Sequence, residues 1–156
     1  MSMHLASTAV ERWLFGVCGV WLVGLGVYFI AVRPVLLPED VRFIGAASTA
    51  IDSGAPGLHA WLRHVFVVLG GFMLGSGALT LGAIARLDAP RTRLALAITG
   101  LSTVGLMSAV NFRIGSDFRW LLLLPALLWL CALCTPLWRR VAFGQRRRRD
   151  APPGSP

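Results

Sequence analysis

Four long apolar segments alternate with polar connections along the 156-residue chain. They cover residues 13–32, 65–85, 94–112 and 118–138. Each has close to the roughly 20 residues that an α-helix needs to cross about 30 Å of hydrocarbon. A helix satisfies its backbone hydrogen bonds internally, as a segment in lipid must. The pattern therefore predicts an all-α integral membrane protein with four transmembrane helices.

The first connection, between residues 32 and 65, is the only long one. Pro38 suits the first turn of a helix, and Glu39 and Asp40 complement the positive end of its dipole. A second helix is predicted to open near Pro56 and to continue into the second apolar segment. We expect a single four-helix bundle domain over residues 1–138, with a partly helical extracytoplasmic cap between helices 1 and 2.

The arginines are unevenly distributed between the two sides of such a bundle. Ten of the fifteen fall on the side of the chain termini and five on the other side. Cytoplasmic loops carry the excess of positive charge, so we expect cytoplasmic N- and C-termini in a bacterial inner membrane. Residues 139–156, an arginine cluster before a Pro-rich end, are predicted to be a disordered tail that attracts anionic headgroups.

The composition favours a membrane protein over a soluble or nucleic-acid-binding one. Charged residues make up 14% of the chain, against about 25% in a typical soluble domain. The pI near 11.4 would suit a nucleic-acid binder, but the arginines flank apolar segments or cluster near the C-terminus. We therefore expect the lipid bilayer as the main partner and no nucleic acid.

A face of small residues follows the second apolar segment. Gly71 and Gly75 have GxxxG spacing, and Ala78 and Gly82 continue the same face. Small residues let transmembrane helices approach closely. We interpret these four positions as helix-packing residues within the bundle, with a homodimer interface as the alternative.

Residues that could carry chemistry do not form a familiar pattern. Cys131 and Cys134 form a CxxC, but with Cys18 they lie toward the cytoplasmic side, where disulfide exchange with exported proteins cannot occur. We interpret them as small buried hydrophobes. His59 and His64 lack the spacing and the companions of a metal site. No catalytic residue, metal site or cofactor is predicted, which favours a non-enzymatic protein.

Charges gather instead on the predicted extracytoplasmic face. In the stretch NFRIGSDFRW, Gly115 permits a turn and Ser116 is a favoured N-cap. Arg113 follows the negative end of one helix, Asp117 begins the next at its positive end, and Arg119 can reach headgroups, so each charge has a structural use. The alternative is a ligand or partner site. Its candidate residues are Glu39, Asp40, Arg42, Asn111, Arg113, Asp117 and Arg119.

Two stretches carry a family resemblance. A first span ending in RPVLLPEDVRFIG, a connection, and three spans with VNFRIGSDFRW before the last resemble small, functionally uncharacterised four-span bacterial inner-membrane proteins. The order is more loosely similar to the DoxX-like class of four-helix membrane proteins. The resemblance covers most of the chain and implies partnership with other envelope or redox proteins, and it assigns no catalytic residue.

These patterns lead to two functional hypotheses. The first is a non-enzymatic accessory protein that binds a ligand or a membrane-protein partner through its polar extracytoplasmic face. The second is a small oligomeric transporter or a lipid-modifying enzyme with a cavity between its helices. For the second, the middle of the membrane offers only hydroxyl residues and the kink at Pro125.

Overall fold

The computed structural model describes the backbone of residues 2–149 and the side chains of residues 9–136. The chain is 84% helix and has no strand in this part, which confirms the predicted all-α class. Three helices are long: α1 (Ser2–Ala31), α4 (Leu58–Ala83) and α7 (Arg119–Arg149). The shorter elements are α2 (Pro38–Ile44), α3 (Ser48–Gly54), η1 (Ile84–Arg86), α5 (Pro90–Gly100), the π-helical turn η2 (Leu101–Gly105) and α6 (Leu106–Arg113).

Four helical stretches are long and apolar enough to cross a membrane: Ala9–Ala31, Leu58–Arg86, Pro90–Arg113 and Arg119–Pro136. Between 17% and 28% of the residues in their most apolar windows are buried inside the molecule. Large apolar side chains instead face outward, with Leu79 77% exposed and Leu101 76% exposed. Water-soluble monomers rarely expose large apolar patches, so this surface suits lipid as its solvent.

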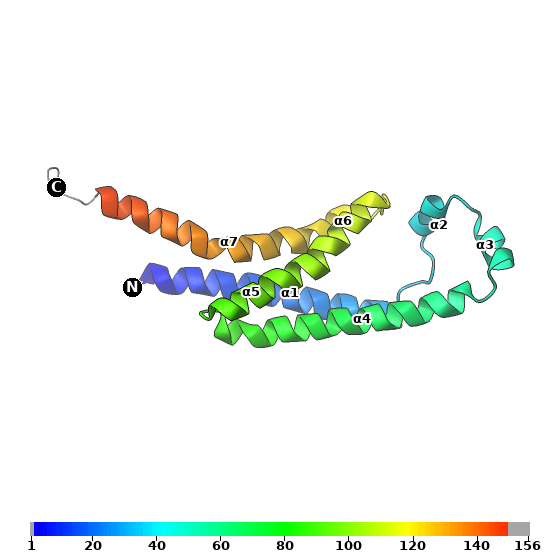
Figure 1. The fold of residues 1–156 in the computed structure, drawn as a ribbon, viewed down its shortest axis with the longest axis horizontal. Coiled ribbons are helices and arrows are strands. Elements are labelled where there is room, and N and C mark those ends of the chain that lie inside the picture. The colour runs from blue at the N-terminus through cyan, green and yellow to red at the C-terminus, as the bar shows by residue number, and fades with distance from the viewer. Residues whose placement is uncertain (1, 150–156) are drawn as a thin grey trace.

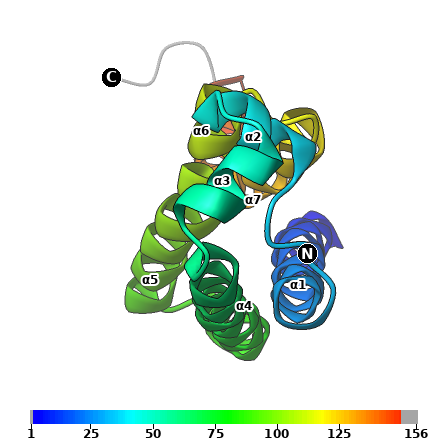
Figure 2. The ribbon, with the colours of Figure 1, turned by 90° about the vertical axis from the view of Figure 1, so that its right-hand side faces the viewer.

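The long helices run along a common direction (Figure 1). α1 begins and α7 ends at one end of the molecule, and α2 and α3 lie at the other. α1 and α4 lie side by side (Figures 1 and 2). The third membrane-spanning stretch, made of α5, η2 and α6 and called the third crossing below, runs obliquely to them (Figure 1). α7 also packs against α1, so α1 contacts both of the other long helices.

Glycines set the close approach of α1 and α4. A Cβ added to Gly26 would lie 2.6 Å from the carbonyl oxygen of Gly70, and one on Gly77 would lie 2.7 Å from that of Gly19. These contacts leave no room for a side chain, so the two backbones touch directly. We call this contact the α1–α4 seam.

The predicted small-residue face is not part of this seam. Within the part of the chain whose side chains are described, nothing lies within 4 Å of a Cβ added to Gly71, Gly75 or Gly82, and Ala78 is exposed. Successive helical residues are about 100° apart around the axis, so Gly70 faces α1 while Gly71 does not. The prediction that these four residues pack within the bundle is therefore wrong for this chain by itself.

Trp129 joins α7 to two other helices in the core. Its ring meets Phe15 of α1 edge to face, with centroids 5.6 Å apart. Its indole N–H donates a hydrogen bond to the Leu96 carbonyl of α5 (2.9 Å), and Gly100 leaves the space that the ring occupies. Satisfying the indole N–H in an apolar interior fixes how α7 docks.

The cysteines lie in different environments. Cys18 is fully buried, and its thiol donates to the Pro125 carbonyl at 3.6 Å. Cys131 is exposed and Cys134 is partly exposed, and all three are free. The prediction of burial holds for Cys18 and is wrong for Cys131, because the side of α7 that carries Cys131 faces away from the other helices.

The end of the chain also differs from the prediction. α7 continues as a helix to Arg149, whereas disorder was predicted from residue 139. Arginine and alanine favour helix, and arginines near a helix C-terminus complement its negative end. The side chains of the arginine cluster and all of residues 150–156 lie outside the described part, so the predicted attraction to anionic headgroups stays a prediction.

Candidate functional site

α2 is attached to the turn between α6 and α7 by two polar contacts. The first joins two buried side chains: the hydroxyl of Ser116 donates to Glu39 Oε1 at 3.3 Å. The second joins Arg42 to Asp117 at 2.9 Å, with both side chains about 60% exposed. A solvated ion pair contributes little, so the buried Glu39–Ser116 contact is the stronger link.

The turn itself forms as its sequence predicts. Gly115 has a φ of +66°, a conformation that residues with a Cβ rarely adopt. Ser116 Oγ also accepts a hydrogen bond from the Phe118 N–H (3.2 Å), immediately before α7 begins. Ser116 therefore caps the start of α7 and also binds α2 through Glu39.

Asp40 and Arg33 connect the start of α2 to the ends of α1 and α4. The Leu37 N–H donates to the Asp40 carboxylate at 2.9 Å, which caps α2, and Arg33 approaches the same carboxylate at 3.4 Å. The Arg33 guanidinium also lies 3.7 Å from the centre of the Phe66 ring, a cation–π contact. Both charges thus have structural partners.

The structure therefore divides the predicted site residues into two groups. It brings Glu39, Asp40, Arg42 and Asp117 together around α2. Arg113 is exposed and Arg119 partly exposed, and neither forms an ion pair within the described part of the chain. These two arginines remain available for an anionic headgroup or a partner.

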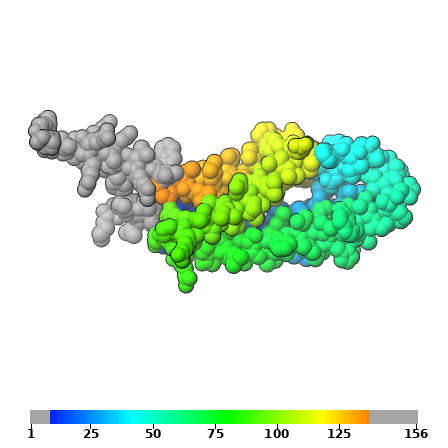
Figure 3. All heavy atoms as spheres, in the orientation of Figure 1, coloured from blue at the N-terminus to red at the C-terminus, as the bar shows by residue number. Residues whose placement is uncertain are grey.

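Asn111, the last predicted site residue, borders a cavity of about 410 Å³. We call this cavity the α4–α6 groove. It lies between α1, α4 and the η2–α6 part of the third crossing. Its walls include Leu22 and Phe29 of α1, Phe72 and Met73 of α4, and Leu106 and Val110 of α6. In the space-filling view, α1 shows through the hollow between α4 and the third crossing (Figure 3).

Three polar side chains of the third crossing line this groove, and each is already a donor to its own helix. Ser102 Oγ donates to the Ile98 carbonyl (2.9 Å) and Thr103 Oγ1 to the Thr99 carbonyl (2.6 Å). Asn111 Nδ2 donates to the Met107 carbonyl (2.9 Å). A hydroxyl has one proton and two lone pairs, so Ser102 and Thr103 can offer a ligand only acceptors.

Ser102 and Thr103 belong to η2, where the Leu106 N–H reaches the carbonyl of Leu101, five residues earlier. Such π-helical turns often occur at functional sites. Sequence reasoning did not identify the groove. The signal available was the set of hydroxyl residues in the third apolar segment, but no sequence rule shows that α4 diverges from them.

A buried ion pair at the opposite end of the molecule was also missed. Glu11 of α1 is 2% exposed, and Arg93 of α5 approaches its carboxylate at 3.1 Å. Arg93 Nε also donates to the Leu87 carbonyl at 2.7 Å, at the junction that leads into α5. Arg93 thus holds the start of the third crossing against α1, which is a structural role.

Comparison with protein-family models, curated proteins and solved structures gives no match to this chain. Across the described residues, no three His, Cys, Asp or Glu side chains gather as a metal site would require. The polar groups that line the α4–α6 groove are two hydroxyls and an amide, which are hydrogen-bonding groups without charge.

Proposed function

We propose that this is a non-enzymatic bacterial inner-membrane protein that binds an amphipathic molecule of the bilayer in the α4–α6 groove. In this proposal the four spanning helices form a bundle with cytoplasmic termini, and α2 and α3 are its extracytoplasmic cap. The observation that carries the proposal is the 410 Å³ groove with three polar side chains in an apolar wall. Ligand sites are typically concave, mostly apolar and marked by a few polar groups.

The position of the groove supports a ligand from the bilayer. Phe72 is 72% exposed and Leu106 is 59% exposed, so the groove opens sideways toward lipid. From Ser102 to Asn111 the helix rises about 14 Å, close to half of the roughly 30 Å hydrocarbon thickness. The length of the groove therefore matches one lipid acyl chain in one leaflet of the bilayer.

The chemistry of the lining narrows the class of ligand. No charged side chain borders the groove among the described residues, so the part of the ligand inside it is neutral. The free lone pairs of Ser102 and Thr103 call for a donor. An apolar chain that bears a hydroxyl or an amide N–H fits both requirements, and a polar end could extend toward Arg113 and Arg119.

Native mass spectrometry of the protein released from membranes in a gentle detergent tests this proposal. We expect a bound molecule of defined mass on the wild-type protein. Met73→Trp adds bulk to the groove and should remove that mass, whereas Leu79→Trp, on an outward-facing part of α4, should retain it. A bare wild-type protein, or a Met73→Trp variant that retains the ligand, would refute the proposal.

The predicted polar extracytoplasmic face, which includes Arg113 and Asp117, is tested by a separate experiment. Arg113→Gln and Asp117→Asn should weaken capture of a ligand or partner more than they lower the unfolding temperature. If both variants change only thermal stability, helix capping accounts for these residues. Arg42→Gln is a suitable comparison, because it breaks the same exposed ion pair as Asp117→Asn without changing the turn.

One observation favours the second candidate, a small oligomeric transporter or lipid-modifying enzyme. The face of α4 that carries Gly71, Gly75 and Gly82 has no neighbour among the described residues and could receive a second copy. An Ala78→Cys variant, made without the native cysteines, should then form a disulfide dimer in membranes at low expression. Absence of that dimer would contradict this candidate, because it requires an oligomer.

A further inference from the structure

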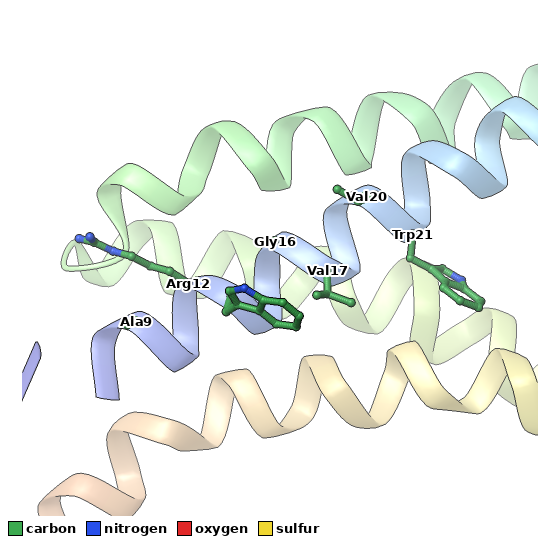
Figure 4. A pocket seen from close by; sticks show the side chains of 7 residues that line it. Ala9, Arg12, Gly16, Val17, Val20 and Trp21 are labelled. Atoms are coloured by element: carbon green, nitrogen blue, oxygen red, sulfur yellow. The ribbon is translucent and has the colours of Figure 1, made fainter. Parts of the chain in front are cut away.

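A second and larger cavity runs along the first half of α1. It has a volume of about 790 Å³, and its described lining comes entirely from α1: Ala9, Arg12, Trp13, Gly16, Val17, Val20 and Trp21. We call it the α1 groove. Figure 4 shows Val17 and Trp21 on the side of α1 that faces the α7 ribbon, with Arg12 extending from the end of the groove. The groove is separate from the α4–α6 groove and lies toward the other end of the molecule.

Among the described side chains, Arg12 is the cation that lies at the mouth of this groove without an ion-pair partner. Glu11, the acidic neighbour of Arg12, is turned into the protein, where Arg93 approaches it at 3.1 Å. Arg12 is exposed and has no ion-pair partner among the described residues. A positive charge therefore lies at one end of a groove whose other described lining residues are uncharged.

The dimensions match one lipid leaflet. From Ala9 to Trp21 the helix rises about 18 Å, slightly more than half of the roughly 30 Å hydrocarbon core. Trp13 is 73% exposed, and indoles concentrate at the level of the headgroups. The charge and this indole thus lie where a headgroup would be, and the valines lie where a chain would be.

The walls favour a lipid chain over another helix. Transmembrane helices associate through faces of small residues, which let their backbones approach. Here two tryptophans, Trp13 and Trp21, stand two helical turns apart with Val17 between them. Such bulky walls keep a helix of about 10 Å diameter at a distance, but they leave space for a thin alkyl chain.

We propose that the α1 groove binds one anionic phospholipid. Its phosphate lies against the Arg12 guanidinium, and one acyl chain follows Trp13, Val17 and Trp21. The site is independent of the ligand proposed for the α4–α6 groove.

The experiment is a titration of the full chain in a neutral detergent, followed by native mass spectrometry. The probes are phosphatidylglycerol and phosphatidylcholine with identical acyl chains. An exposed basic side chain near an anionic surface contributes about 1 kcal/mol, which is a factor of about five in affinity. The first phosphatidylglycerol should therefore bind about fivefold more tightly than phosphatidylcholine.

Substitutions locate the site. Arg12→Gln should remove the fivefold preference, and Arg12→Lys should restore most of it. Arg86→Gln is the matched control, because Arg86 is exposed at the same end of the molecule and does not line the groove. Val17→Trp should fill the groove and weaken binding of both lipids, whereas Leu79→Trp should not.

Four results would overturn the proposal. Equal losses in Arg12→Gln and Arg86→Gln would indicate diffuse attraction to the basic end. Full affinity in Val17→Trp would place the lipid elsewhere. A wild-type dimer that Val17→Trp converts to a monomer would show that a second copy occupies the groove. If a variant fails to fold, a wild-type protein without preference for phosphatidylglycerol would refute the proposal by itself.

Discussion

Replacing Gly70 by alanine should separate the helices at the α1–α4 seam and lower the stability of the protein. The same change at the adjacent Gly71 should leave the stability nearly unchanged. A Cβ at Gly70 would lie 2.7 Å from the Gly26 carbonyl oxygen, 2.7 Å from Ile30 Cγ1 and 3.0 Å from Phe29 Cβ. A Cβ at Gly71 would have no described atom of a neighbouring helix within 4 Å. The two positions are adjacent in α4 and receive the same substitution. They differ only in the side of α4 to which they point.

The size of the effect follows from these distances. Ordinary contact begins near 3.4 Å, so the helices must separate by about 0.7 Å. A gap of that size loses a quarter to a half of the dispersion attraction between facing atoms. Overpacking of this kind typically costs about 1–3 kcal/mol. Because the obstructing oxygen and Cβ are fixed to the backbone, we expect Gly70→Ala to cost roughly 2 kcal/mol.

Unfolding by SDS in mixed micelles, followed by tryptophan fluorescence, measures this difference. The helices persist in the unfolded reference state, so the higher helix propensity of alanine largely cancels. Gly71→Ala should lie within about 0.5 kcal/mol of the wild type. Equal losses at both positions would refute the assigned packing face, and a larger loss at Gly71 would indicate that a second copy packs there.

Two further predictions concern polar contacts, and thermal unfolding in detergent measures both. Arg93→Gln should lower the free energy of unfolding by about 3 kcal/mol, because it removes a cationic partner from the buried Glu11 carboxylate; a loss below about 1 kcal/mol would contradict this role. Ser116→Ala should cost about 1–2 kcal/mol, because it removes a helix cap and the hydroxyl that contacts Glu39. Arg42→Gln, at the exposed ion pair, should cost less than about 1 kcal/mol, and a larger loss than in Ser116→Ala would reverse our ranking of the two contacts.

The spanning helices could be predicted because lipid imposes a simple rule. A segment of sufficient length and hydropathy must be helical, since no water is present to satisfy its backbone. The start of α2 was predictable for a similar local reason: Pro38 and the acidic residues after it favour a first helical turn. Gly115 and Ser116 likewise identify the turn before α7 from neighbouring residues alone.

Side-chain partners across the bundle could not be predicted in the same way. Glu11 and Arg93 are 82 positions apart, and no local pattern relates them. The small residues of α4 offered two possible faces, and hydropathy does not determine which of them turns toward α1. The α4–α6 groove depends on how α4 and the third crossing lie relative to each other, and no local sequence pattern specifies that arrangement.

The π-helical turn has a consequence for how the third crossing tolerates deletions. A turn closed by bonds over five residues accommodates one residue more than an α-helical turn. Deleting a residue within Leu101–Gly105 would therefore leave an ordinary α-helix, with Ser108 still in place to donate to the Leu122 carbonyl. The same deletion outside this turn would rotate all later residues by about 100°. The extra residue is thus dispensable for joining α5 to α6, and a shortened protein could keep its fold while losing the hydroxyl arrangement of the groove.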